Sequence, residues 1–179
     1  MAGLLPPLVL MTDDARLPDP VAAARTLPGG SMVVVRARDA ARRAVLVQAL
    51  LRLSGLVVLV AGDPSLAAQA DGLHLPQARA HEAGHWRARH PRWRITAALH
   101  GAAAPGPHLD AAFLSPVFPT RSHPERSALG AARANRIAAA ISTPLYALGG
   151  IDARNAHLLE GFVGIAAIGA LDSDIHHGV

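Results

Sequence analysis

The sequence predicts a (β/α)₈ barrel, a closed ring of eight parallel strands with helices packed outside it. Eight short apolar runs alternate along the chain with helical or irregular segments, as expected for parallel strands joined by crossover connections. The last two runs each end in glycine, where such barrels commonly bind phosphate. Half of the residues are hydrophobic (51%) but only 3% are aromatic, so we expect an aliphatic core of helices on a buried sheet.

The predicted strands are apolar at consecutive positions and are bounded by Gly, Pro or polar residues, as in strands covered on both faces. They span residues 8–11, 32–35, 56–60, 72–75, 95–99, 111–114, 145–148 and 165–168. Helices are expected at residues 20–27, 40–53, 65–69, 80–89, 131–141 and 153–160. Residues 102–109 contain two prolines and are expected to form an irregular connection.

The chain of 179 residues is short for this fold, which typically needs about 250 residues. Several helices should therefore be single turns or absent. A doubly wound open sheet is the alternative, and the count of eight strands favours the barrel. We expect residues 1–179 to form one domain, with a polar tail at residues 172–179 that is frayed.

The composition excludes several kinds of chemistry. The chain has no cysteine, and all 17 of its basic residues are arginine. Disulfides, thiolate nucleophiles and cysteine-bound metals are thereby excluded. The lack of lysine excludes Schiff-base catalysis, pyridoxal phosphate enzymes and the P-loop.

The net charge is +4, and residues 87–94 form a cluster of arginines together with Trp86 and Trp93. A nucleic-acid-binding face combines basic and aromatic residues in this way, but a solvated amphipathic helix is the favoured interpretation. No apolar run is long enough to cross a bilayer, and the first residues lack signal-peptide features. We therefore expect a soluble, cytoplasmic protein without nucleic-acid or membrane partners.

Residues 81–85 read HEAGH and match the zinc-protease signature HExxH. On one helix His81 and His85 would share a face, and Glu82 could act as a base. However, Gly84 weakens the helix, and no third ligand stands at a suitable spacing. A zinc hydrolase is therefore only the third of three functional hypotheses.

Three motifs carry a resemblance to a known family. Residues 70–77 read ADGLHLPQ, residues 115–120 read SPVFPT, and residues 145–151 read LYALGGI, followed by Asn155 and Ala156. In this order they resemble motifs of the thiamine phosphate synthase family, which includes the TenI-type thiazole tautomerases. The resemblance extends from residue 8 to about residue 171. It implies an enzyme of thiamine biosynthesis, a transferase that couples hydroxymethylpyrimidine diphosphate to thiazole phosphate with Mg²⁺ and releases pyrophosphate.

The resemblance also implies the partners and the phosphate site. Small phosphorylated pyrimidine and thiazole compounds would be the ligands, and the family precedent suggests a homo-oligomer. Gly149 and Gly150 match the phosphate-binding turn after the seventh strand, and Gly169 and Ala170 would complete it after the eighth. Glycine allows backbone N–H groups to approach an anion closely. A plain tight turn is the alternative interpretation.

Arg36 and Arg38 follow the second strand, where alternate residues project to the same side. Both are expected to contact a diphosphate, because guanidinium groups bind phosphate through two parallel hydrogen bonds; a surface pair is the alternative. Thr120, Ser122 and His123 match ligand-binding positions in the loop after the sixth strand, with His123 where the family has Lys. Hydroxyl residues in such loops are often only turn formers.

Three further residues are expected to line the same site through the resemblance. His74 and Gln77 lie at the end of the fourth strand, and His100 follows the fifth. A single histidine in an apolar strand is more often a hydrogen-bonded structural group, which is the alternative for both histidines. No catalytic residue is assigned from the sequence.

The metal positions depart from the family. Its magnesium carboxylates follow the third and fourth strands, where this chain has Ala-Gly-Asp63 and Ala-Arg79. Asp63 is therefore the one candidate Mg²⁺ ligand, and a single carboxylate is a poor site for a Mg²⁺ ion that is bound to a diphosphate. Val34 and Ala98 replace a family Gln and Ser, and Pro116 replaces the tautomerase histidine. The first hypothesis is the synthase, and the second is a relative that binds thiamine-pathway phosphates or a protein partner without catalysis.

Overall fold

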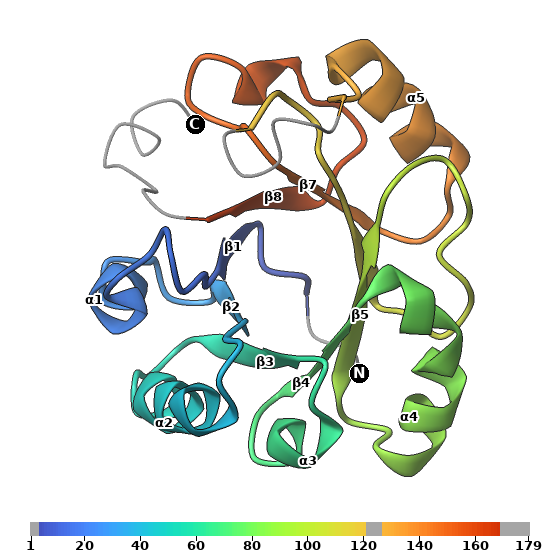
Figure 1. Cartoon of the computed structure of the whole chain (residues 1–179). Coiled ribbons are helices and arrows are strands. Elements are labelled where there is room, and N and C mark those ends of the chain that lie inside the picture. The colour runs from blue at the N-terminus through green and yellow to red at the C-terminus, as the bar shows by residue number, and fades with distance from the viewer. Residues whose placement is uncertain (1–3, 121–126, 169–179) are drawn as a thin grey trace.

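Eight parallel strands form a closed ring in the order β1-β2-β3-β4-β5-β6-β7-β8. Figure 1 shows this ring in the computed structural model of the chain, which describes residues 4–120 and 127–168. The ring closes where β8 hydrogen-bonds to β1, with Val9 opposite Ala166. The predicted barrel is therefore confirmed, and the open doubly wound sheet is excluded.

Every predicted strand is present, and no boundary differs from the prediction by more than one residue. The strands are β1 Leu8–Met11, β2 Met32–Val35, β3 Val57–Ala61, β4 Gly72–Leu75, β5 Arg94–Leu99, β6 Ala111–Leu114, β7 Leu145–Leu148 and β8 Gly164–Ala167. Consecutive apolar residues are typical of strands whose two faces are both buried, and this pattern located the strands in the sequence.

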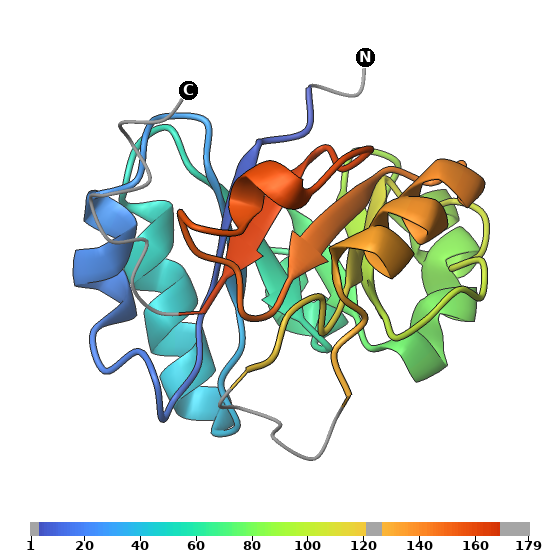
Figure 2. The ribbon, with the colours of Figure 1, turned by 90° about the horizontal axis from the view of Figure 1, so that it is seen from above.

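The helices are short, as the chain length predicts. They are α1 Pro20–Arg25, α2 Ala40–Leu51, α3 Pro64–Ala67, α4 Ala83–Arg89 and α5 Ala131–Ala140, with 3₁₀ turns η1 at Gln77–Glu82 and η2 at Ala156–Leu158. Asp19, Asp39 and Asp63 cap the first three helices by accepting a backbone N–H. In Figure 2, α1 and α2 lie together on one side of the barrel, and α4 and α5 lie on the other.

Two predicted helices differ from the structure. The helix expected at residues 153–160 is only the 3₁₀ turn η2. Asn155 donates to the Gly150 carbonyl and accepts from the Asp152 N–H, and such side-chain bonds compete with helix formation. The helix expected at residues 80–89 begins as the 3₁₀ turn η1 and becomes α-helical only at Ala83.

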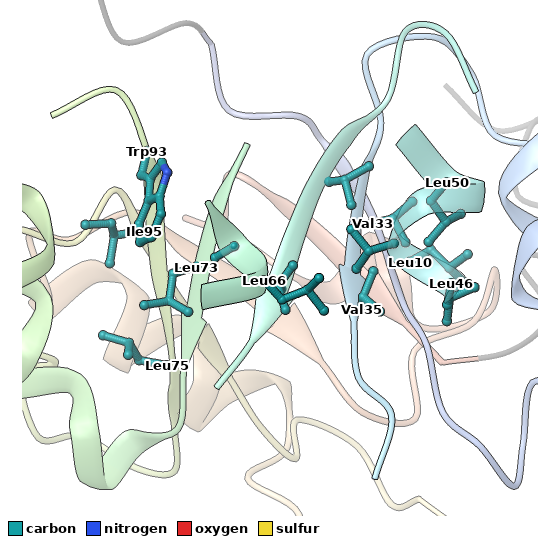
Figure 3. Close-up of a cluster of buried hydrophobic side chains, with 14 of the residues drawn as sticks. Leu10, Val33, Val35, Leu46, Leu50, Leu66, Leu73, Leu75, Trp93 and Ile95 are labelled. Atoms are coloured by element: carbon teal, nitrogen blue, oxygen red, sulfur yellow. The ribbon is translucent and has the colours of Figure 1, made fainter. Parts of the chain in front are cut away.

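Two apolar layers hold the barrel together. Outside the ring, side chains of β1 to β5 pack against α2 and α3, and Figure 3 shows Leu10, Val33 and Val35 facing Leu46 and Leu50. Alternate residues of the strands fill the inside of the ring. These interior residues are Val9, Met11, Met32, Val34, Leu59, Ala111, Phe113, Tyr146, Leu148 and Ala166.

None of the helices in residues 4–120 and 127–168 has the length and apolar character that a bilayer span requires.

Tyr146 joins the segment before β1 to the barrel interior. Its ring is fully buried and stacks on Phe113, and its hydroxyl donates to the Pro6 carbonyl at 2.7 Å. Burial raises the pKa of Tyr146 to about 12. The hydroxyl therefore stays protonated at neutral pH and keeps this bond.

We expect Tyr146→Phe to lower the free energy of unfolding by about 1–2 kcal/mol, because a buried carbonyl loses its donor. Urea denaturation at pH 7 measures this change. Thr26→Ala is the control, since the Thr26 hydroxyl is exposed and bonds locally to Ala23. Equal stability of Tyr146→Phe and the wild type would contradict the structural role of this hydrogen bond.

Candidate functional site

A cavity of about 1290 Å³ opens at the carboxyl ends of the strands. Its floor is formed by interior residues of the barrel, including Met11, Phe113 and Leu148, and its rim by the loops that follow the strands. In barrels of this architecture the active site occupies this end. Of the predicted site residues, those that line the cavity are Arg36, Arg38, His74, His100, Thr120, Gly149 and Gly150.

Arg36 is fixed to the end of β2 by its own backbone. The buried hydroxyl of Thr12 accepts the Arg36 N–H and donates to the Arg36 carbonyl, both at 2.8 Å. The Arg36 side chain is half-buried, and its guanidinium makes no hydrogen bond or ion pair within the described part of the chain. Burial lowers the pKa of Arg36. A guanidinium remains charged in proteins, so the cavity contains a cation, and Asp13 is the acidic group whose charge acts on it.

The loop after β1 adds charges beside Arg36. Asp13 pairs with Arg16 at 2.7 Å, and this hydrogen bond lowers the pKa of Asp13 to about 2. Asp14 accepts the Arg38 N–H at 2.9 Å, which connects the ends of β1 and β2. Both carboxylates line the cavity, so the rim carries bound negative charges as well as arginines.

Gly149 and Gly150 form the turn after β7, with φ angles of 99° and 65°. Their N–H groups donate to no protein carbonyl within residues 4–120 and 127–168. The turn packs against the loop after β6, because Phe118 donates to the Gly149 carbonyl at 3.0 Å. Successive N–H groups on such a turn can form an anion-binding concavity.

His74 lies on the floor of the cavity and is only 6% exposed. The register of β4 and β5 places it opposite Thr96, and its Nδ1 is 2.9 Å from the Thr96 hydroxyl oxygen. Its ring meets Phe113 edge to face at 5.0 Å. Burial, and then the charge of Arg36, lower the pKa of His74 to about 3. The imidazole is therefore neutral at physiological pH.

His100 and Gln77 form one side of the rim together. The Gln77 side-chain oxygen accepts the His100 N–H at 2.6 Å, and Gln77 itself does not line the cavity. The His100 Nδ1 lies 3.1 Å from the Ser115 carbonyl oxygen. Gln77 is therefore placed to position His100 through the backbone. The predicted residues Ser122, His123, Gly169 and Ala170 lie outside the described residues.

Asp63 does not line the cavity. One of its oxygens caps α3 by accepting the Leu66 N–H at 3.1 Å, and the other pairs with Arg43 at 3.4 Å. Within residues 4–120 and 127–168, no three histidine or acidic residues gather as a metal would require. Both oxygens of the predicted ligand are thus engaged within the protein, so Asp63 does not fit a bound Mg²⁺, which needs a carboxylate oxygen open to it.

The sequence did not indicate several residues of the rim. Arg43, Asp152 and Arg154 line the cavity, and Asp152 pairs with Arg154 at 2.7 Å. Arg43 lies in the first turn of α2, where a charged side chain is usually solvated, so its sequence position alone gave no signal. Asp13 and Asp14 come two and three residues after the apolar strand β1, and this position was the available signal for them.

The HEAGH segment does not form one continuous α-helix, because η1 ends at Glu82 and α4 begins at Ala83. The Glu82 carboxylate accepts two hydrogen bonds from Arg79, at 2.7 and 2.8 Å, and a third from Trp86 at 3.1 Å. The Arg79 hydrogen bonds, followed by that from Trp86, lower the pKa of Glu82 to about 2. Glu82 is thus occupied as a hydrogen-bond acceptor and is unsuited to act as a base.

Some residues of the arginine cluster at residues 87–94 have a structural role. Trp93 is buried and stacks on His90 with ring centroids 3.6 Å apart. Arg87 pairs with Asp110 at 2.6 Å and donates to the Trp93 carbonyl. These residues attach α4 to β5, so Arg87 and Trp93 are not freely presented on a surface.

Fold and cavity together define a (β/α)₈ barrel with an apolar floor and a rim rich in arginine and in backbone donors. The sequence model of the family described as "Thiamine monophosphate synthase" matches residues 8–171. The chain belongs to this family.

Two relatives illustrate the likeness. The curated protein "Putative thiamine-phosphate synthase 2" of Aquifex aeolicus (strain VF5) is 32% identical over 93 residues, and the match covers 50% of each protein. The solved structure of thiamine phosphate pyrophosphorylase from Pyrococcus furiosus matches with a TM-score of 0.71 and 20% identity, over 94% of this chain and 89% of that chain. At this identity the structural match shows the fold.

The buried His74 should make stability depend on pH. Its pKa is about 3 in the folded protein against 6.5 as the ordinary value, so the unfolded chain binds more protons between these values. Stability should therefore fall as the pH drops below about 6.5, by about 2 kcal/mol between pH 7 and pH 5. Urea denaturation of the wild type and of His74→Asn at both pH values isolates this contribution. If both proteins lose the same stability, His74 is not the cause.

Gly150→Ala should distort the turn after β7. A Cβ at Gly150 would overlap the Pro119 carbonyl oxygen and lie 2.9 Å from the Phe118 carbonyl carbon. Gly62 has a similar φ of +71° with open space around it, so Gly62→Ala is a matched control for backbone strain. We expect Gly62→Ala to cost about 1 kcal/mol and Gly150→Ala at least about 1 kcal/mol more, measured by thermal or urea unfolding. Equal losses would mean that the turn and the loop separate easily.

Proposed function

We propose that the cavity binds small phosphorylated pyrimidine and thiazole compounds and that the protein couples hydroxymethylpyrimidine diphosphate to thiazole phosphate. One observation carries the proposal. The half-buried Arg36 guanidinium, which has no partner among the described residues, lines the same cavity as Gly149 and Gly150, whose N–H groups donate to no carbonyl in residues 4–120 and 127–168. These groups are suited to bind two separate anions, because cations and backbone donors both stabilise phosphate.

The reaction breaks one bond and forms one bond. The bond between the pyrimidine methylene carbon and the diphosphate oxygen breaks, and the oxygen keeps the electron pair. The lone pair of the thiazole nitrogen then forms the new bond to that carbon, which gives thiamine phosphate and pyrophosphate. No oxidant is needed, and no protein nucleophile forms a covalent bond.

The proposed roles follow from the surroundings of each group. Arg36 and Arg38 would stabilise charge on the leaving diphosphate, because preorganised cations act where charge develops. Gly149 and Gly150 would hold the thiazole phosphate. The apolar floor around Phe113 would exclude water from the carbocation formed when the diphosphate leaves.

A second candidate function is ligand binding without turnover, as in a degenerate or TenI-type thiazole-phosphate-binding relative. The observation that favours it is the engagement of Asp63, the one predicted metal ligand, with Arg43 and the α3 cap. Only a turnover measurement separates the two functions, because both use the same anion-binding groups.

The test is the formation of thiamine phosphate from hydroxymethylpyrimidine diphosphate and thiazole phosphate, measured by chromatography with parallel detection of pyrophosphate. We expect product with the wild type and a loss of at least about tenfold in kcat/KM for Arg36→Gln, because a charge-assisted contact to the leaving group is removed. Arg25→Gln, on the exposed end of α1, is the control for the loss of one charge. Ligand binding without product above background would establish the binding-only function instead.

A further inference from the structure

We infer that Arg43 takes the place of a divalent cation in this cavity, so that a diphosphate is bound by guanidinium groups without metal. The choice of diphosphate rests on the proposed function. The inference adds how this anion is held, and it concerns a residue that the sequence motifs did not indicate.

Two hydrogen bonds hold one edge of the Arg43 guanidinium in place, and Arg43 also lines the cavity. It belongs to the first turn of α2, and its Nε–H donates to the Ala37 carbonyl at 3.1 Å. Its Nη1 donates to the Asp63 carboxylate at 3.4 Å. The side chain is only 16% exposed and lines the cavity. These two bonds order a side chain that would otherwise be flexible.

The remaining donors of Arg43 are suited to an anion. A guanidinium has five N–H groups, and the bonds to Ala37 and Asp63 use two of them. Three therefore remain without an acceptor in the part of the chain that the structure describes. The charged residues that line the cavity are five arginines and three aspartates (Arg16, Arg36, Arg38, Arg43, Arg154, Asp13, Asp14 and Asp152), which leaves two net positive charges. A planar guanidinium binds two phosphate oxygens at once.

The acidic groups near Arg43 are already occupied. The two oxygens of Asp63 accept from Leu66 and Arg43. Those of Asp14 accept from the Arg38 N–H and pair with Arg42. A divalent ion at Asp63 would have to displace the Arg43 cation and repel it at short range. The position that should hold a metal ion therefore holds a protein cation.

The test is calorimetric titration of the whole protein with inorganic pyrophosphate, in EDTA and in MgCl₂. We expect binding in EDTA that is at least as tight as binding in MgCl₂. Arg43→Gln should weaken binding in EDTA at least tenfold, and Arg43→Lys should weaken it less because the charge is kept. Arg52→Gln is the matched control, since it removes a charge at the other end of α2, outside the cavity lining.

Asp63→Asn distinguishes an arginine site from a metal site. Asparagine is also a good helix cap, so the fold should be kept. If Arg43 binds the anion, the variant keeps pyrophosphate binding in EDTA, because the Arg43 charge and its hydrogen bond to Ala37 remain. If Asp63 binds Mg²⁺, the variant loses binding that depends on MgCl₂. Binding that requires MgCl₂, or that is unchanged in Arg43→Gln, overturns the inference.

The two proposals can fail separately. Pyrophosphate binding in EDTA without coupling of the two substrates would refute the synthase activity and leave the Arg43 site intact. Product formation together with pyrophosphate binding that depends on MgCl₂ would support the synthase activity and refute the Arg43 site.

Discussion

The hydrogen bonding of β8 to β1 is the constraint on which the site depends. All neighbouring strands are parallel, so closing the ring brings the carboxyl end of each strand to one rim. Arg36 after β2, His100 after β5 and Gly149 after β7 lie far apart in the sequence but line one cavity for this reason. An open sheet of the same strands would leave these residues along an edge.

The arginines of the rim are positioned by hydrogen bonds between the segments that follow neighbouring strands. The Thr12 hydroxyl holds Arg36, and Asp14 holds the backbone of Arg38, so the arginines are positioned through their main chains. Among residues 4–120 and 127–168, neither guanidinium group makes a hydrogen bond. Arg43 differs, because Asp63 fixes its side chain directly. In this rim, Arg36 and Arg38 are therefore held by their backbones, and Arg43 is held by its side chain.

Much of the fold could be predicted from the sequence, because buried parallel strands leave a local signal of consecutive apolar residues ended by breakers. The helix predicted at residues 153–160 was wrong, since the side-chain bonds of Asn155 depend on contacts that apolar periodicity does not encode. The same limit applies at Gln77, which supports His100 from behind the cavity wall. Arg43 was missed because its role depends on packing between α2 and the start of α3, which no local pattern records.

The absence of lysine from the chain has a consequence for control of the cavity. Guanidinium groups keep their proton at all physiological pH values, and acetylation, which neutralises lysine, cannot act on them. The positive charge of Arg36, Arg38 and Arg43 is therefore permanent. A phosphate ester that enters the cavity has a second ionisation near pH 6. The pH dependence of binding would therefore follow the ionisation of the ligand and not that of the arginines.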